Sequence, residues 1–260
     1  MFSSELWNNP GSSQVLTQKA IFGFGQNGGS RTGVTNLVND EGTVASDTSA
    51  VGTARDGPAG SGYGEDKAIF GFGTTGTRTA ITNLVSNEGV VASDTSGVGT
   101  ARNELAAAAF GGDKAIFGFG TTGSTSNLSN LVSNQGVVAS DTSGVGAVRG
   151  WLAATGYGED KAIFGFGFLS PGNANTGITN LVSNTGVVAS DTAGVGTARI
   201  LLAAAVYGGD KAIFGFGRIA TSGSSGTAIT NLVSNQGVVA SDTSGVGSVR
   251  LTLAAAGYAN

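Results

Sequence analysis

The chain has 260 residues, of which 46 are glycine and 3 are proline; charged residues make up 12% and the net charge is −4. It contains no cysteine and no histidine, which excludes disulfides, thiol nucleophiles, Cys/His zinc sites and every catalytic triad that needs a histidine. The acidic balance argues against nucleic-acid binding, and no apolar run reaches the roughly 18 residues that a membrane helix needs.

Residues 1–18 precede the first repeat of the chain, and we expect them to form an N-terminal extension. The opening stretch, MFSSELWNNPGSS, lacks the basic and apolar regions of a secretory signal. We therefore expect a protein that is not secreted through a signal peptide and that belongs in the cytoplasm or in a particle assembled there.

Five repeats of about 47 to 50 residues fill residues 19–260, which we expect to form a single domain. The phrase KAIFGFG begins at Lys19, Lys67, Lys114, Lys161 and Lys211. An NLV phrase follows, and its asparagine lies 19 positions before a closing arginine in every repeat. The repeats differ in length mainly between KAIFGFG and NLV, so each repeat contains one loop that is free to vary.

Each repeat predicts four short strands separated by turn residues. Strand A is of the LAAAGYG type, strand B is KAIFGFG, strand C is TNLVSN and strand D is VVASDT. A GGD or GED turn joins A to B, the variable loop joins B to C, and an Asn-x-Gly turn such as 87–89 joins C to D. No segment shows a helical apolar period over three turns, so we expect an all-β protein.

Four strands repeated five times predict a five-bladed β-propeller with four antiparallel strands in each blade. The small alanines of strand A, such as residues 106–109, suit the crowded centre of a ring. A phenylalanine of one blade is expected to face a glycine of the next blade. The alternative architecture is a parallel β-solenoid, which has no reason to close.

The two ends of the repeat region favour closure of the ring. The first repeat begins with strand B at Lys19, and the chain ends with a spare strand A at residues 253–258. We expect this C-terminal strand to complete the first blade.

Aspartates and arginines recur at fixed positions in the repeats. They are Asp47, Asp94, Asp141, Asp191, Asp242, Arg55, Arg102, Arg149, Arg199 and Arg250. We interpret them as structural residues that hydrogen-bond turns and neighbouring blades, because an active site is usually a single asymmetric group of residues. Two alternatives are a ligand site used five times and calcium binding in the Asp-Thr-Ser-Gly loops. We expect no catalytic residue, no metal and no cofactor.

The variable loops, residues 26–34, 74–81, 121–129, 168–178 and 218–229, should emerge on one side of the disc. Rigid scaffolds commonly place recognition residues in such loops. Phe168 and Leu169 are candidates for an exposed apolar anchor, and Arg218 for a hydrogen-bonding fork. Arg31 and Arg78 are further candidates for ligand binding.

The hairpin LAAAAFGGDKAIFGFG, residues 105–120, resembles the glycine-doublet strand of kelch-type repeats, although Trp7 and Trp151 are the only tryptophans. The full pattern, KAIFGFG…TNLVSN-x-GVVASDTSGVGTAR…LAAAGYG, is similar to repeats of marine phage and other environmental viral structural proteins. This resemblance covers residues 19–260.

The resemblance and the repeat pattern suggest a non-enzymatic structural or binding module, such as a viral fibre or a virion-associated adhesion propeller. Its expected partners are cell-surface glycans or other virion proteins, without nucleic acid or membrane. Two alternatives are a multivalent carbohydrate-binding lectin and a duplicated or engineered scaffold with no evolved ligand.

Overall fold

The computed structural model describes residues 19–221, 223 and 225–257, and the predicted extension 1–18 lies outside this range. These residues contain strands and turns but no helix, so the all-β prediction is confirmed for them. They therefore include no helix that could cross a membrane.

Four three-stranded antiparallel sheets follow one another along the chain. They are formed by β3 (Ala59–Tyr63), β4 (Lys67–Gly71) and β5 (Thr82–Val85); β6 (Ala106–Phe110), β7 (Lys114–Gly118) and β8 (Ser129–Val132); β10 (Ala153–Tyr157), β11 (Lys161–Gly165) and β14 (Thr179–Val182); and β15 (Ala203–Tyr207), β16 (Lys211–Gly215) and β17 (Thr230–Val233). In each sheet the three strands are the predicted strands A, B and C, with strand B in the middle.

Two smaller sheets complete the structure. The first repeat forms a two-stranded sheet of β1 (Ala20–Asn27) and β2 (Ser30–Val38). The described residues contain no third strand in this sheet. The sequence did not predict the second small sheet, in which β12 (Phe168–Leu169) pairs with both β9 (Arg149–Gly150) and β13 (Ala174–Asn175).

The predicted strand D is not a regular strand. In the third repeat it is joined to β8 by only two bridges, Ser129–Thr142 and Val132–Val138. Between the bridges, the Asn130 side chain donates to the Ala139 carbonyl at 3.0 Å, so a side chain takes the place of a backbone ladder. Each complete repeat is therefore three strands and a bridged segment, and the prediction of four regular strands is wrong in this respect.

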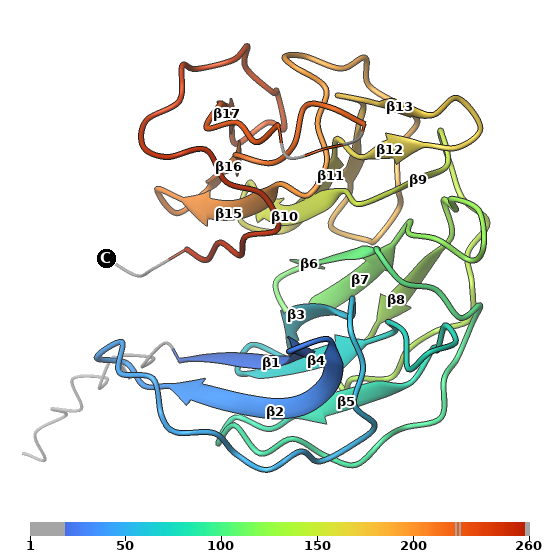
Figure 1. The fold of residues 1–260 in the computed structure, drawn as a ribbon, viewed down its shortest axis with the longest axis vertical. Helices are drawn as coiled ribbons and strands as arrows, with labels where there is room; N and C mark the ends of the chain where they lie inside the picture. Colours follow the sequence, from blue (N-terminus) through green and yellow to red (C-terminus); the bar gives the residue numbers. More distant parts are fainter. Residues whose placement is uncertain (1–18, 222, 224, 258–260) are drawn as a thin grey trace, which may run out of the picture.

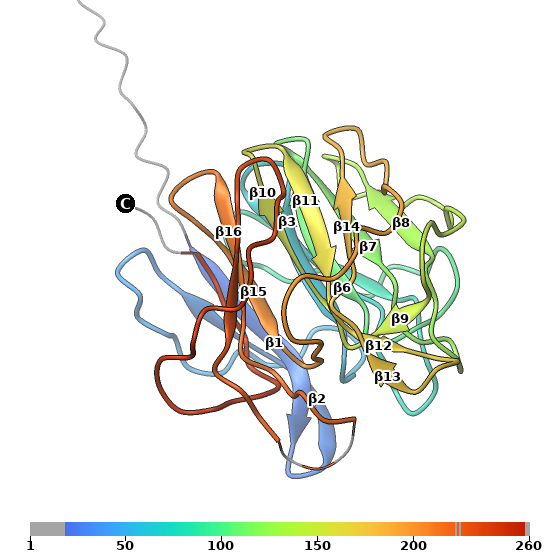
Figure 2. The same cartoon turned by 90° about the horizontal axis from the view of Figure 1, so that it is seen from above.

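The sheets are arranged around an open arc (Figure 1). Neighbouring A strands lie next to one another in the order β3, β6, β10 and β15. The side view shows the sheets stacked with their strands running between the two sides of the arc (Figure 2). The sheet of β1 and β2 and the sheet of β15, β16 and β17 are the two ends of the arc, and they do not meet.

The hydrophobic core lies between successive sheets and depends on a phenylalanine packed over a glycine. The ring of Phe164 in β11 covers Gly118 in β7, where a Cβ atom would lie only 2.6 Å from the Phe164 Cζ atom. Phe119 adds an edge-on contact to Phe164, with 5.1 Å between the ring centroids. The same pairing recurs at Gly71 with Phe117 and at Gly165 with Phe214, so the predicted interlock is confirmed.

The C-terminal segment, residues 251–257, lies next to β15 on the inner side of the arc. The Thr252 amide donates to the Leu201 carbonyl, as the Leu201 amide donates to Trp151 and the Trp151 amide to Glu104. The segment thus takes the next inner position, but it forms no ladder with β1 among the described residues. Closure of a five-bladed ring by this segment stays a prediction.

The interlock predicts a difference between two glycine substitutions. We expect Gly118→Ala to reduce the free energy of unfolding by about 1–3 kcal/mol, because the added Cβ atom would collide with the fully buried Phe164 ring. Gly62→Ala is the matched control, since a Cβ atom there meets only the Lys67 carbonyl oxygen at 3.6 Å. Chemical denaturation of both variants measures the effect, and equal losses would contradict the interlock.

Candidate functional site

A buried arginine joins each repeat to the next. The Arg102 side chain is fully buried, and its Cζ atom lies 4.2 Å from the centroid of the Phe72 ring. Its Nε donates to the Phe119 carbonyl at 2.9 Å, and its Nη2 donates to the Asn130 side chain at 2.6 Å. Burial lowers the pKa of Arg102 to about 10, so the guanidinium is still charged at neutral pH. Arg55, Arg149 and Arg199 are fully buried at the equivalent positions and donate to the equivalent asparagines.

The repeated aspartates receive hydrogen bonds from the preceding repeat. Asp141 accepts from the Thr100 amide at 2.9 Å and from the Thr100 hydroxyl at 2.6 Å. Asn130 of its own repeat donates to it at 2.9 Å, and Arg102 Nη1 lies 3.6 Å away. Burial alone would raise the pKa of Asp141, but these hydrogen bonds outweigh it and hold that pKa below its usual value. Asp94 and Asp242 accept bonds from a threonine of the preceding repeat in the same way, whereas the bond that Asp191 accepts from the preceding repeat comes from the backbone amide of Ala147 alone.

Asp47 and Arg250 occupy the two ends of this series. Asp47 accepts from Asn36 of its own repeat at 2.9 Å, and there is no preceding repeat in the described residues to donate to it. Arg250 lies over the Phe216 ring at 4.2 Å, as the other arginines lie over theirs, but it is exposed. The other repeat positions therefore join neighbouring repeats, whereas these two each face an end of the arc.

The variable loops lie on one side of the arc, where Figure 2 shows the turn between β1 and β2 and the hairpin of β12 and β13. Hydrogen bonds connect loops of neighbouring repeats: the Thr125 hydroxyl donates to the Ser170 carbonyl at 2.7 Å. Asn175 donates its side-chain amide to the Ile219 carbonyl at 3.0 Å. The loops of the third, fourth and fifth repeats are therefore joined to one another. We call the surface formed by the variable loops and the adjacent residues 56, 103 and 104 the loop face.

Arg31 and Arg78 have equivalent places on the loop face. Arg31 Nε donates to Asp56 at 3.0 Å, and Arg78 Nε donates to Asn103 at 3.0 Å. Asp56 and Asn103 each directly follow a repeated arginine, so the two sites have the same geometry in two neighbouring repeats. The Arg31 side chain is 36% exposed, which lets the far end of its guanidinium donate to a ligand.

The sequence led us to expect Phe168 and Leu169 to be exposed, but both are half-buried. Both are held in β12, and the Phe168 ring packs edge-on against Trp151 with 5.6 Å between centroids. Trp151 is one of only two tryptophans in the chain, and the pairing of β9 with β12 brings its ring and that of Phe168 together. Arg218 is also half-buried, with its Nη1 donating to the Gly223 carbonyl at 3.3 Å.

Two residues on or beside the variable loops were not predicted from the sequence. Ile219 follows Arg218 and is 43% exposed, which makes it a more accessible apolar residue than Phe168 or Leu169. Glu104 is half-buried, and burial raises the pKa of its carboxyl, with the nearby Asp56 charge adding to the shift and Arg78 opposing it. A signal for Ile219 was present, since it interrupts a loop of small polar residues.

The loop face is chemically suited to binding polar ligands. It offers guanidinium groups, hydroxyls and amides, which donate and accept hydrogen bonds, beside single apolar side chains. Among the described residues, no three acidic side chains gather in a way that could hold a metal ion. Comparison with models of known protein families finds no match, and comparison with curated proteins finds no relative.

The hydrogen bonds to Asp141 predict a loss of stability in acid. Because the pKa of Asp141 is lower in the folded than in the unfolded protein, its contribution is complete above the ordinary Asp pKa of about 3.9 and is lost as the pH falls through the folded-state value. We expect Asp141→Asn to lower the melting temperature at neutral pH and to flatten its fall below about pH 5, where the carboxylate of the native protein begins to lose its contribution.

Asp47→Asn is the control for this prediction, because it removes a carboxylate from the same repeat position without breaking a bond between repeats. Thermal melts of both variants across the pH range measure the effect. An identical pH profile for the two variants would show that the bonds from Thr100 do not matter for stability.

Proposed function

We propose that the protein is a non-enzymatic binding and structural module that presents one variable loop from each of its five repeats. The observation that carries the proposal is the loop face, where the loops gather on one side and those of the third, fourth and fifth repeats are hydrogen-bonded to one another. The sheets beneath hold these loops through buried arginines and interlocked aromatic rings. Such a rigid base with variable loops is a common arrangement for recognition.

The fold that best fits this function is a β-propeller in which each repeat is one blade. Its support is the succession of similar sheets around an arc, with the alanine-rich A strands on the inner side. A ring of five blades closed within one chain would require β1 to reach residues 251–257.

The setting that we propose is a viral fibre or a virion-associated adhesion protein, with cell-surface glycans or other virion proteins as partners. Its support is the similarity of the repeat pattern to those of phage and environmental viral structural proteins. A module in a virion needs neither disulfides nor a cofactor, which fits the absence of cysteine and histidine from the sequence.

The second candidate function is a multivalent lectin. The observation that favours it is the equivalent geometry of Arg31 on Asp56 and Arg78 on Asn103, which gives two similar hydrogen-bonding sites in adjacent repeats. Repeated weak sites bind a multivalent glycan much more tightly than a single site does.

A glycan array and a host-cell binding assay with the purified protein test both functions. We expect the double variant Arg31→Gln/Arg78→Gln to lose at least about tenfold in binding, because it removes charge-assisted donors from the loop face. Lys114→Gln/Lys161→Gln is the control, since it removes the same charge from turns between strands A and B. Binding to no glycan or cell by the native protein would favour a scaffold without an evolved ligand.

A second variant distinguishes the two ends of the loop face. Ile219→Ser removes the exposed apolar side chain beside Arg218 and should leave the melting temperature unchanged, because the residue is 43% exposed. If the ligand contacts the fourth and fifth loops, binding falls in this variant. Unchanged binding in Ile219→Ser together with a loss in the arginine variant would place the ligand over the first two loops instead.

A further inference from the structure

The contact between neighbouring repeats is made four times in the chain, from residues at the same repeat positions. A phenylalanine of the following repeat covers a glycine of the preceding one, as Phe214 covers Gly165. An arginine of the preceding repeat donates to an asparagine of the following one, as Arg199 donates to Asn231 at 2.6 Å. A loop of the preceding repeat also donates to the repeated aspartate of the following one.

The first repeat carries one unused half of this contact, which we call the leading face. Its phenylalanine, Phe22, is 55% exposed, whereas Phe117, Phe164 and Phe214 are fully buried at the same repeat position. β1 is paired with β2 alone in the described residues, so it has no strand A beside it. Asn36 and Asp47 also belong to the leading face.

The fifth repeat carries the other unused half, which we call the trailing face. Arg250 is exposed, although the four equivalent arginines are fully buried. Tyr207 and Leu232 are 39% and 41% exposed, whereas the equivalent Tyr157 is only 4% exposed and contacts the following repeat. The C-terminal segment, residues 251–257, lies beside this face; it has the sequence of a strand A but is not a regular strand and pairs with no strand B among the described residues.

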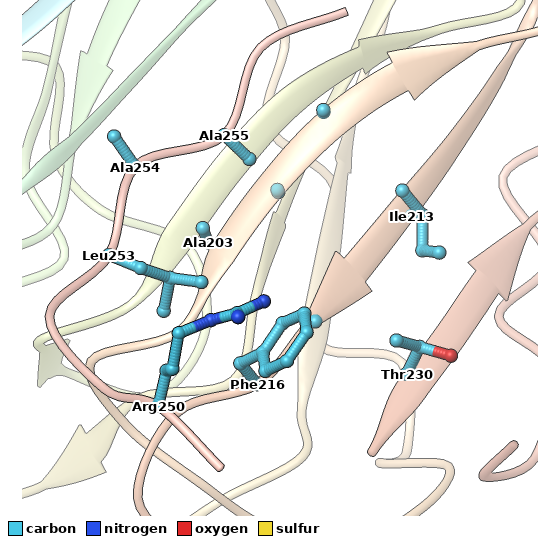
Figure 3. Close-up of a pocket in the computed structure, with 11 residues that line it drawn as sticks. Ala203, Ile213, Phe216, Thr230, Arg250, Leu253, Ala254 and Ala255 are labelled. Carbon is cyan, nitrogen blue, oxygen red and sulfur yellow. The ribbon is translucent and has the colours of Figure 1, made fainter. Parts of the chain in front are cut away.

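A pocket of about 270 Å³ opens on the trailing face. Figure 3 shows Arg250 alongside the Phe216 ring, with Leu253, Ala254 and Ala255 on one side and Ile213 and Thr230 on the other. Gly215 also lines the pocket, and it is the counterpart of Gly165. In the contact between the fourth and fifth repeats, the Phe214 ring covers Gly165. The pocket at Gly215 is therefore the place that the phenylalanine of a following repeat would fill.

We propose that the trailing face binds the leading face of a second copy of this chain. Phe22 of one copy enters the pocket of the other, and residues 254–257 pair with β1 so that Ala255 lies opposite Phe22. This register is that of β15 and β16, in which Ala204 lies opposite Phe214. Arg250 then donates to Asn36, as Arg199 does to Asn231.

Charge and hydrogen-bonding capacity on the two faces support this pairing. Ser248 occupies the position of Thr197, whose hydroxyl donates to Asp242 at 2.6 Å, and Asp47 is the equivalent acceptor on the leading face. The interaction therefore continues an interface that the chain already makes four times.

The occupant is a second copy because the packing of the sheets leaves the two faces of one chain apart (Figure 1). Two unlike faces leave one of each unoccupied in a dimer, so further copies can add.

Cysteine cross-linking tests the proposal directly, because the chain contains no cysteine of its own. One sample of full-length protein carries Asp47→Cys and a second carries Ser248→Cys, and the two are mixed and treated with a short bifunctional thiol reagent. We expect a covalent dimer in the mixture that is reduced or absent in each variant alone. The variant Thr100→Cys/Asp141→Cys is the positive control, since these side chains already lie 2.6 Å apart within one chain.

The double variant Asp47→Cys/Ser248→Cys distinguishes association from ring closure. Cross-linked dimers and larger species support the proposal. A cross-linked monomer from the double variant, with no dimer in the mixture, would overturn it and show that one chain closes its own ring. No cross-link in either sample would also overturn it.

Sedimentation of uncross-linked protein gives an independent measure. We expect association to increase with concentration and to be lost in Phe22→Glu, because the charged side chain cannot enter an apolar pocket without a partner. Val187→Glu is the control, since Val187 is 65% exposed and lies in the fourth repeat, away from both faces. A native protein that stays monomeric, or equal association in both variants, would contradict the proposal.

Discussion

Four fully buried guanidinium groups hold neighbouring repeats together. Burying a charge is costly unless it is neutralised by hydrogen bonds and nearby charges. Each group therefore requires the ring beneath it, the carbonyls around it and an asparagine that only the next repeat supplies, as Arg102 requires Asn130. A single repeat cannot provide this environment, so the stability of each repeat depends on its neighbour, as in other repeat proteins.

The packing of aromatic rings on glycine imposes a steric constraint in addition to this electrostatic one. Gly118 lies under Phe164 because any side chain there would collide with the ring. The second phenylalanine of each FGF triplet has a positive φ, 63° at Phe119, which turns its ring toward the following repeat. An arginine covers the other side of this ring, as Arg149 covers Phe119 at 4.1 Å. Polar and apolar contacts therefore fix the same arrangement of successive sheets.

The sequence predicted those features that depend on spacing and residue type. The turns and alternating residues of each repeat predicted strands A, B and C, and the glycines beside phenylalanine predicted the interlock. The bridged form of segment D was not predictable, because there an asparagine side chain replaces a backbone ladder. The half-burial of Phe168 was missed for a similar reason, since it depends on β9, a two-residue strand formed only when the fourth loop reaches back to it.

The hydrogen bonds between adjacent loops have a consequence for how the loops can change. Since Thr125 both donates to the Ser170 carbonyl and accepts from the Ser170 amide, the shape of the fourth loop depends on a residue of the third. The fourth loop in turn bonds to the fifth through Asn175. Diversification of these loops is therefore expected to proceed by correlated substitutions in neighbouring pairs. A loop grafted from another protein would need its neighbour to be redesigned with it.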